Sequence, residues 1–413
     1  MAKAKPNAGA LRSSRYYKRV RHLAVIAGLA AAIAVSTIAD SPALAARPRV
    51  APPALPFGAD WTHDFEGAPP VTAAVSEAGL LIVGFANKLD AISLATGQAE
   101  WSLPVPASRL ACDATSCVAG DNVTVRGIDL AGKTVRWQKP SPGPLAFAPV
   151  LRSGWVFLTA TDGRVIALHD TDGATLWTFV ADGALTGPPS ADGDRLAVAT
   201  ARSTVSLLNL TTGRALWTSR PLAALPGAPR LGGGMVYVGT EDRKLAFIDA
   251  GTGTLKFSVR TGGTVMGAPA LDDRFVYGAG QDGVLRAFDR GSGALRWYAD
   301  LPTRPASVGP VTDGGLTIIA LGNGAFQAYL ATGDGKTSAA VIAPPGAGDS
   351  TVLLPTPPMI VGAGASMRLV TLSSSVGDDS KWSAAVTRAA AGLTLSALPA
   401  TIPGLALTLT PPQ

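Results

Sequence analysis

Two cysteines are the residues of this sequence whose chemistry is simplest to assign. Cys112 and Cys117 are its only cysteines, and four residues separate them. They stand at the facing ends of two short apolar runs, which we expect to be adjacent antiparallel strands with paired Cα atoms ~4.5–5.5 Å apart. The spacing matches neither a four-ligand zinc site nor the two-residue gap of redox motifs. We therefore predict a disulfide, formed in an oxidising compartment.

A second stretch matches a phosphate-binding formula. Residues 127–134 read Gly-Ile-Asp-Leu-Ala-Gly-Lys-Thr, which fits the P-loop pattern letter for letter. That pattern binds phosphate because a following helix directs backbone amides at the anion. Here no helical pattern follows, and the stretch lies just before Trp137 in a repeat of strands. We predict a strand, a turn and a strand at this position, and no nucleotide site.

No other group of residues predicts a catalytic centre. His63 and His169 are the only histidines after residue 45, and neither has a metal-ligating partner at a suitable spacing. Acidic residues such as Asp162, Asp242 and Asp282 recur at one position of the repeat, whereas a catalytic carboxylate should break that symmetry. No Gly-x-Ser-x-Gly nucleophile elbow is present. The sequence thus predicts no catalytic residue, no metal site and no cofactor.

Aromatic residues at a fixed spacing show how the chain is organised. They follow one another at intervals of 40, 36, 40, 40, 40 and 40 residues, at Trp61, Trp101, Trp137, Trp177, Trp217, Phe257 and Trp297. Spacing this regular indicates a repeat architecture. We predict that each ring docks between neighbouring repeats, where burying ~200 Å² is worth ~5 kcal/mol before opposing terms are counted.

Turn signals accompany each aromatic residue. A glycine lies four residues before it in most copies, and a residue eight before it is suited to bond the backbone amides of that turn. We predict these turn anchors at Asp129, Asn209, Asp249 and Asp289. A second turn, often Asx-Gly, separates two apolar runs, and a proline opens each copy. Each copy therefore predicts four antiparallel strands in about forty residues, the size of one β-propeller blade.

The number of blades follows from how the ring closes. Seven copies end near residues 101, 137, 177, 217, 257, 297 and 337, and an irregular eighth begins near Thr351. The isolated strand around Trp61 has no blade before it, so we expect it to complete the last blade. Trp382 offers that blade a competing outer strand. We predict an all-β propeller of eight blades, with seven as the alternative.

The repeat resembles a known family. The segments DAGTGTLKF, DRGSGALRW, NLTTGRALW and SLATGQAEW are similar to the PQQ-like (pyrroloquinoline-quinone-like) propeller repeat, over nearly all of residues 60–385. That family includes quinoprotein dehydrogenases and non-catalytic envelope proteins of the type that assists outer-membrane β-barrel assembly. The dehydrogenases imply a Ca²⁺-bound quinone, an aspartate base and a disulfide between adjacent cysteines. Here the cysteines are not adjacent, which favours the non-catalytic branch.

Segments outside the repeat predict export. Residues 1–45 combine a basic stretch, an apolar run and Ala-Leu-Ala, which is typical of a cleaved signal peptide; an uncleaved anchor is the alternative. We divide the remainder into a Pro-rich linker at 46–58, the propeller at 59–385 and an apolar tail at 386–413. The tail either packs on the propeller as strands or a strap, or is offered to a partner by strand addition.

Charge narrows the set of partners. The sequence has 35 Lys and Arg residues and 29 Asp and Glu residues. Residues 1–45 contain seven of the basic residues and one of the acidic residues, so 28 basic and 28 acidic residues remain. A neutral mature chain has no electrostatic footprint for nucleic acid. We predict a monomeric, periplasmic, cell-envelope or extracellular scaffold without a membrane span, which binds envelope proteins and takes part in outer-membrane protein assembly. The alternatives are a quinone-dependent oxidoreductase and a glycan- or small-ligand-binding propeller.

Overall fold

The computed structural model describes residues 57–66, 70–219, 223–307, 309–313, 316–322 and 326–330, and the strands at 339–342, 351–353, 359–361, 368–375, 381–389 and 407–410. The predicted signal peptide, most of the linker and most of the tail lie outside these residues. The described part contains strands and turns without a helix. Accordingly, none of its segments is an apolar helix that could cross a membrane.

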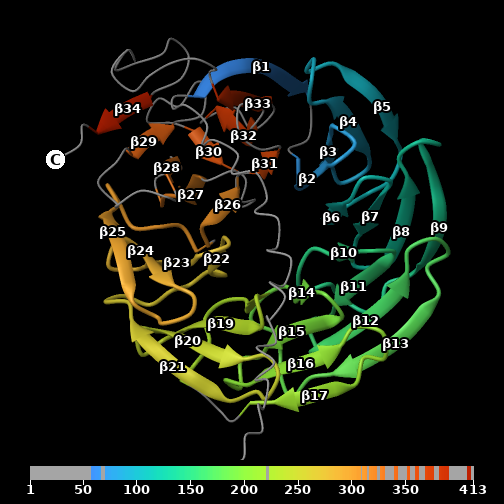
Figure 1. The fold of residues 1–413 in the computed structure, drawn as a ribbon. Coiled ribbons are helices and arrows are strands. Elements are labelled where there is room, and N and C mark those ends of the chain that lie inside the picture. Colours follow the sequence, from blue (N-terminus) through green and yellow to red (C-terminus); the bar gives the residue numbers. More distant parts are fainter. Residues whose placement is uncertain are drawn as a thin grey trace, which may run out of the picture. The chain divides into compact units, whose positions relative to one another are not determined.

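The described strands form eight antiparallel sheets, arranged around a ring in Figure 1. Blade 1 consists of β2 (Thr72–Ser76), β3 (Leu80–Gly84), β4 (Leu89–Ser93) and β5 (Ala99–Leu103). Blade 2 consists of β6 (Arg109–Cys112), β7 (Ser116–Gly120), β8 (Thr124–Asp129) and β9 (Thr134–Pro140). Blade 3 consists of β10 (Val150–Arg152), β11 (Trp155–Thr159), β12 (Arg164–His169) and β13 (Thr175–Val180).

Blades 4 to 6 repeat the same order of four strands. Blade 4 consists of β14 (Ser190–Asp192), β15 (Arg195–Ala199), β16 (Val205–Asn209) and β17 (Ala215–Thr218). Blade 5 consists of β18 (Arg230–Gly232), β19 (Met235–Thr240), β20 (Lys244–Asp249) and β21 (Leu255–Arg260). Blade 6 consists of β22 (Ala270–Leu271), β23 (Phe275–Gly280), β24 (Val284–Asp289) and β25 (Leu295–Asp300).

The last two blades have five strands each, where the repeat predicts four. Blade 7 contains β26 (Val311–Asp313), β27 (Leu316–Ala320), β28 (Phe326–Leu330), β29 (Ala339–Ile342) and β34 (Leu407–Thr410). Blade 8 contains β30 (Thr351–Leu353), β31 (Met359–Val361), β32 (Arg368–Ser375), β33 (Lys381–Ala389) and β1 (Phe57–Glu66). In blade 8 two short strands, β30 and β31, pair with different parts of β32.

Ring closure occurs as the sequence predicts. Strand β1 pairs antiparallel with β33, which pairs with β32, so the N-terminal strand is the outer strand of blade 8. Trp382 does not displace it, because β33 lies inside β1 and Trp382 stands opposite Phe65. The blade strands extend slightly beyond the expected bounds of 59 and 385, because β1 begins at Phe57 and β33 continues to Ala389. In the tail, β34 adds to the outer edge of β29.

Local sequence explains where the strands begin. The first strands of blades 3 to 7 begin at the residue that follows a proline, which lacks the N–H that a ladder needs. Glycines take left-handed φ at the last turn, for example +66° at Gly213. In blade 2 this position is Lys133, a non-glycine residue at φ 54°. Glycine is thus the usual residue at this turn because it adopts left-handed φ without the strain that a Cβ atom causes.

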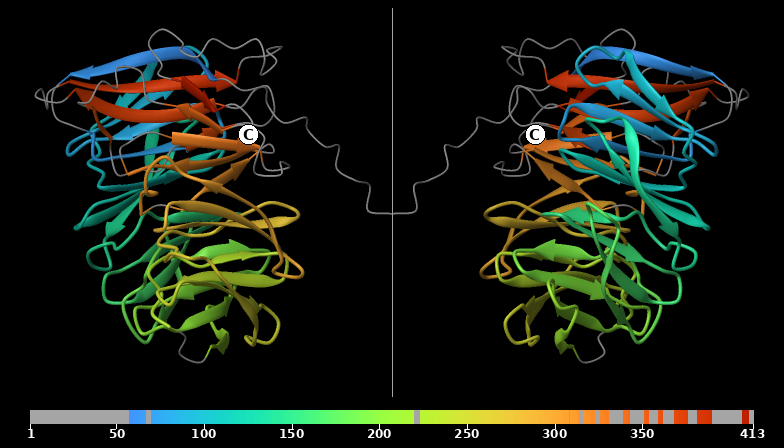
Figure 2. Two further views of the ribbon diagram at one scale, coloured as in Figure 1. Left: turned by 90° about the vertical axis from the view of Figure 1, so that its left-hand side faces the viewer. Right: turned by 90° about the vertical axis from the view of Figure 1, so that its right-hand side faces the viewer.

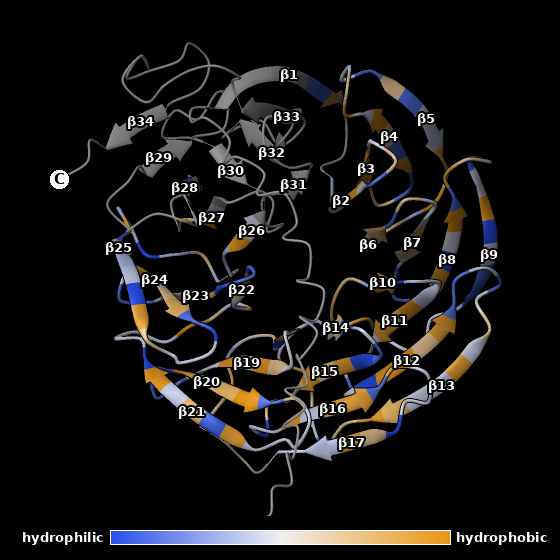
Figure 3. Ribbon diagram, in the orientation of Figure 1, coloured by the Kyte–Doolittle hydropathy of each residue, from blue (hydrophilic) through white to orange (hydrophobic). Residues whose placement is uncertain are grey.

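The core consists of separate apolar layers between successive sheets. Blades 4 and 5 share one layer that includes Leu207, Val236, Val238 and Ile248. Blades 2 and 3 share another, which includes Val118, Val156 and Trp137. Figure 3 shows apolar residues along the middle strands and mixed character on outer strands such as β9. No blade can bury its faces alone, so the stability of the ring depends on neighbouring blades.

Turns gather at the two rims of the ring, which Figure 2 shows from the side. Rim 1 carries the turns between the first and second strands and between the third and fourth strands of each blade. Rim 2 carries the hairpin turns between the second and third strands, and the connections from one blade to the next. Loops held by a rigid scaffold are where binding residues are usually found.

Candidate functional site

The predicted disulfide is present at rim 1. Cys112 and Cys117 are bonded across the β6–β7 hairpin, directly opposite each other in the ladder, with Cα atoms 4.1 Å apart. The turn that they flank is tight, because the Asp113 amide donates to the Ser116 carbonyl at 2.9 Å. Cys117 is fully buried between blades 1 and 2. The bond therefore fixes one hairpin of the short second blade.

The Asp113 carboxylate holds this turn from inside. Its Oδ1 accepts hydrogen bonds from the backbone amides of Thr115 and Ser116, each at 2.8 Å. This is an Asx turn, in which a short acidic side chain replaces a backbone acceptor. The arrangement aims the Ser116 hydroxyl outward from blade 2, toward blade 3.

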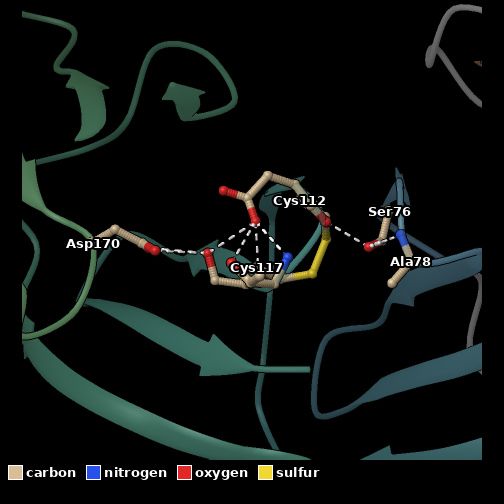
Figure 4. The surroundings of a disulfide bond; sticks show 8 residues. Ser76, Ala78, Cys112, Cys117 and Asp170 are labelled. Atoms are coloured by element: carbon tan, nitrogen blue, oxygen red, sulfur yellow. Dashed lines mark hydrogen bonds between the residues drawn. A yellow bond between two sulfur atoms is a disulfide. The ribbon is translucent and has the colours of Figure 1, made fainter. Parts of the chain in front are cut away.

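A chain of hydrogen bonds then joins three blades (Figure 4). The Ser76 hydroxyl of blade 1 donates to the Asp113 carbonyl at 2.5 Å. The Ser116 hydroxyl donates to both Asp170 carboxylate oxygens, at 3.1 and 3.0 Å. Asp170 is 7% exposed, and Arg136 Nη1 lies 3.9 Å from it. A buried carboxylate normally needs such partners, so this chain acts as a joint between blades 1, 2 and 3.

The contacts of this joint are those of a structural hydrogen-bond network. Ser116 donates its proton toward a carboxylate whose other neighbour is an arginine, and no histidine of the described residues bonds to it. A serine nucleophile requires a general base that can take and later return the proton. Asp170 is instead held as an acceptor, which is a structural role.

The predicted docking aromatics lie between blades, and four of them share one geometry. Each indole Nε1 donates to the carbonyl oxygen of the residue 33 positions later, in the next blade. The pairs are Trp61 with Leu94 at 2.9 Å, Trp137 with Asp170 at 2.5 Å, Trp177 with Leu210 at 2.9 Å and Trp217 with Ala250 at 3.0 Å. Blades 8, 2, 3 and 4 are thereby bonded to a turn of the next blade.

The aromatic side chain packs against the glycine of that next turn. A Cβ atom at Gly213 would collide with Trp177 Cδ2, and one at Gly97 would lie 2.7 Å from Trp61 Cδ2. Sequence reasoning assigned these glycines to turn geometry and missed their contact with the preceding aromatic. The interval of 36 residues from the aromatic to the next blade's glycine was the available signal, and it holds for all of these aromatics except Trp101, where the next turn has Lys133.

The remaining predicted aromatics depart from this geometry. Phe257 packs against Gly293, but a phenyl ring has no N–H to donate. Trp101 packs into the layer between blades 1 and 2. Trp297 is 4% exposed, and its Nε1 has no hydrogen-bond partner among the residues that the structure describes. The indole hydrogen bond is therefore absent at Trp101 of blade 1 as well as from blade 5 onward.

The predicted turn anchors all contact backbone amides. Asp129 accepts from Gly132 at 3.3 Å and Asn209 from Thr212 at 2.9 Å. Asp249 accepts from Gly251 at 2.9 Å and Thr252 at 3.0 Å, and Asp289 accepts from Gly291 at 3.1 Å and Ser292 at 2.9 Å. These contacts make the anchors parts of rim 1 turns.

Hydrogen bonding lowers the pKa of two anchors. For Asp249 the main cause is the bond from Lys256, followed by the Thr252 amide. For Asp289 the amide and hydroxyl of Ser292 and the Arg296 guanidinium lower the pKa to about 2. Both carboxylates stay ionised at neutral pH, as a turn acceptor requires.

His63 contacts the next blade, and His169 contacts its own turn. His63 Nδ1 is 2.8 Å from the Gly97 carbonyl, so this nitrogen carries the proton. His169 stands at the position where other blades have the turn anchor Asp. Its Nδ1 is 2.8 Å from the Thr171 hydroxyl of the same turn. Across the described residues, no three His, Cys, Asp or Glu side chains are grouped to hold a metal ion. Residues 127–134 form the end of β8, a turn and the start of β9.

Rim 2 carries repeated ion pairs. The hairpin turn of blade 2 pairs Asp121 with Arg126 at 3.1 Å, that of blade 3 pairs Asp162 with Arg164 at 2.7 Å, and that of blade 6 pairs Asp282 with Arg286 at 2.6 Å. Asp242 and Lys244 pair in blade 5. Rim 2 is therefore a charged, exposed surface on a rigid frame, which suits recognition of another macromolecule.

The repeat matches a known family model over much of the propeller. The model described as Outer membrane protein assembly factor BamB matches residues 110–186 and 172–344. No curated protein matches the sequence.

Solved structures share the fold. BamB from Moraxella catarrhalis is 18% identical, with a TM-score of 0.60 over 80% of this chain and 98% of that one. The computationally designed Ika8 protein is 14% identical, with a TM-score of 0.58 over 79% and 99%. Sqt1 of Saccharomyces cerevisiae is 15% identical, with a TM-score of 0.60 over 82% and 99%. Likeness at these identities concerns the fold alone.

Proposed function

Because the chain belongs to the family described as outer membrane protein assembly factor BamB, we propose that it is an exported, non-catalytic scaffold that binds other proteins of the cell envelope. The observation that carries this proposal is the family match, whose two parts together span more than half of the chain. The finer role that we propose is in the assembly of outer-membrane proteins. A rigid ring with two turn-bearing rims can present several contacts at once, which suits this role.

The chemistry of the described residues supports a scaffold over an enzyme. Many ionisable side chains of both rims are engaged in turns and ion pairs that repeat from blade to blade. An active site requires a group whose environment differs from that of its symmetric copies, so that its pKa and position suit one reaction. The one deeply held carboxylate among the described residues, Asp170, bonds a serine and serves the joint between blades.

Export is part of the proposal. The Cys112–Cys117 disulfide is consistent with an oxidising compartment, since such bonds rarely persist in a reducing cytosol. The expected signal peptide at 1–45 is outside the described residues and remains a prediction. Fractionation of cells that express the full chain, with detection of the mature N-terminus by mass spectrometry, tests both points.

Crosslinking in cells tests the scaffold role. A photo-crosslinking residue placed at exposed positions of rim 1 and rim 2 should capture a defined protein, at a ratio near one partner per chain. The same residue on the exposed outer strand, at Val180, serves as the control position. Absence of a reproducible partner from both rims would remove the proposal. Dye-linked alcohol oxidation after addition of the quinone and Ca²⁺ would establish the enzymatic alternative instead.

A further inference from the structure

The outer strand of each blade has a free edge unless a fifth strand covers it. Blades 1 to 6 end at their fourth strand, whereas β34 and β1 add a strand to the outer edges of blades 7 and 8. A free edge presents unpaired backbone N–H and C=O groups, which can pair with an extended strand of another chain. Proteins commonly prevent this by placing proline or a charged side chain on the edge, or by covering it.

Five of the six free edges carry such a protecting residue three positions after the aromatic of the blade. These residues are Pro104, Pro140, Arg220, Arg260 and Asp300. In blade 3 the residue at this position is Val180, and it is 67% exposed. Blade 3 therefore departs from the pattern that protects the other edges.

The residue just before the aromatic shows the same departure. In blades 2, 5 and 6 this residue is basic and pairs with the turn anchor, as Arg136, Lys256 and Arg296 do. Blade 1 has Glu100 at this position. Blade 3 has Leu176, which is 42% exposed. Blade 4 has Leu216 there but keeps a charged residue at the first position, so only blade 3 of these six is apolar at both.

The free backbone groups of β13 lie at exposed residues. The Ala181 amide donates to the Gly163 carbonyl at 3.1 Å, so the backbone groups of Ala181 point toward the β12 side. Alternate residues of an antiparallel strand direct their N–H and C=O to opposite sides. Thr178 and Val180 therefore direct theirs away from β12, in a stretch whose pairing with β12 is regular. The side chains of both residues are exposed, so another strand can reach them.

The charged side chains beside this edge already have partners. Lys139 of blade 2 donates to the Gly173 carbonyl at 2.8 Å. Arg164 stands opposite Val180 in the ladder and pairs with Asp162 at 2.7 Å. Strand β13 itself contains no charged residue. The edge therefore favours an uncharged strand, because a charged residue placed on it would lose water without gaining an opposite charge.

Blade 7 shows what such an edge pairs with in this chain. Its strand β29 also contains no charged residue, and β34 covers it in antiparallel register. The sequence of β34 is Leu-Thr-Leu-Thr, in which apolar residues alternate with threonine. Among the residues that the structure describes, no fifth strand covers β13, although Figure 1 shows it on the outside of the ring like β29.

We propose that the outer edge of blade 3, along residues 176–180, binds an extended, uncharged strand of a partner protein by strand addition. This inference rests on the proposed scaffold function and names the chemistry of its partner. The backbone groups of Thr178 and Val180 supply the ladder hydrogen bonds, and the exposed side chains of Leu176 and Val180 contact apolar residues of the added strand. A segment in which apolar residues alternate with Thr or Ser, as they do in β34, fits this edge.

The repeat itself supplies the test variant. Leu176→Lys with Val180→Arg copies Lys256 of blade 5 and Arg220 of blade 4, so this blade 3 variant should fold with a protected edge. The matched control is Leu295→Lys with Tyr298→Arg, which adds the same two charges at exposed positions of β25. Circular dichroism and urea unfolding verify that both proteins are folded.

The probe is a fluorescently labelled peptide that copies residues 405–411, Leu-Ala-Leu-Thr-Leu-Thr-Pro, with a lysine at each end for solubility. The comparison peptide has proline at the positions of Leu407 and Leu409, because proline cannot donate to a ladder. Fluorescence anisotropy measures binding of both peptides to the wild-type chain, the blade 3 variant and the control.

We expect the wild-type chain and the control to bind the first peptide, and the blade 3 variant to bind it about tenfold or more weakly. The affinity should change little with salt, since ladder hydrogen bonds and apolar contacts are not screened as ion pairs are. The proline peptide should not bind. Equal binding by all three proteins, or binding by none, would overturn the inference.

A second copy of the chain is the other source of such a strand. Light scattering after size-exclusion chromatography measures the mass of the wild-type chain over a range of concentrations. An oligomer that grows with concentration and disappears in the blade 3 variant would assign the edge to the tail of a second copy, and would overturn the proposal of a separate partner. A monomer at all concentrations supports it.

Failure of this inference can be separated from failure of the scaffold role. Val180, the comparison position for the two rims in the crosslinking experiment above, is itself on this edge, so Leu295 of β25 takes its place as the control here. Capture of a partner from the rims but not from Val180 leaves the scaffold role standing and overturns the strand-addition site. Capture from Val180 and not from Leu295, together with the peptide result, supports both.

Discussion

The indole nitrogen of Trp137 donates to the carbonyl oxygen of Asp170 at 2.5 Å, across the boundary between blades 2 and 3. The carboxylate of the same Asp170 receives the Ser116 hydroxyl of blade 2 at 3.0 Å. One residue of blade 3 is therefore bonded to blade 2 through both its backbone and its side chain. The disulfide lies next to Ser116 in the chain, so this is the most heavily bonded of the joints described.

Replacement of Trp137 by phenylalanine should destabilise the ring more than the same change at Trp297. Trp137→Phe leaves the buried Asp170 carbonyl without its donor, which costs about 1–3 kcal/mol. Trp297→Phe removes an N–H that has no described partner, so it mainly reduces buried volume. Urea unfolding of both variants measures the difference. Equal losses would show that the indole hydrogen bond contributes nothing beyond packing.

Alanine at Gly213 should be far more harmful than alanine at Gly154. Both glycines have positive φ, of 66° and 83°, so both changes carry a backbone cost of ~1 kcal/mol. At Gly213 the new Cβ atom would also collide with Trp177, whereas nothing lies within 4 Å of it at Gly154. Thermal unfolding should show a larger loss of Tm for Gly213→Ala, with a change in tryptophan fluorescence. A smaller loss than at Gly154 would contradict the docking geometry.

Removal of the disulfide should weaken the protein modestly. The bond joins residues five apart in sequence, and the entropy of closing so short a loop corresponds to ~2 kcal/mol. The double variant Cys112→Ala with Cys117→Ala should therefore unfold at a lower urea concentration, and a dithiol reductant should no longer affect it. A reductant-dependent shift that persists in the variant would mean that another effect of the reductant is being measured.

Acid should release the Asp289 turn only at very low pH. The folded-state pKa of about 2 lies below the ordinary value near 3.9, so the ionised form is favoured by folding. Its contribution to stability is complete above pH ~4 and is lost as pH falls toward 2. An NMR titration of the carboxyl group should give a midpoint near 2, and Asp289→Asn, which copies Asn209 of blade 4, should remove this dependence. A midpoint near the ordinary value would show that the turn does not favour the charged form.

Replacement of Arg243 by glycine should stabilise the chain. Relief of the left-handed conformation is worth ~1 kcal/mol. Ser203→Gly, at φ 66° in blade 4, is the control that relieves similar strain without removing an arginine. Both should raise Tm by a similar amount. A loss of Tm in Arg243→Gly would show that the side chain stabilises its own hairpin.

By itself the sequence predicted the repeat, an all-β propeller of eight blades with seven as the alternative, the Cys112–Cys117 bond and the closing N-terminal strand. These follow from local signals, because glycine, proline and Asx residues punctuate each copy and the aromatic interval counts the blades. The family match confirms the PQQ-like repeat on which that interpretation depended.

Only the tertiary structure decided which groups meet across blade boundaries. The acceptors of the tryptophan ladder are backbone carbonyls, which carry no sequence signal, and the Ser116–Asp170 bond joins residues 54 apart. The fifth strands of blades 7 and 8 likewise come from pairing between distant segments, because an open sheet edge accepts any extended strand that reaches it.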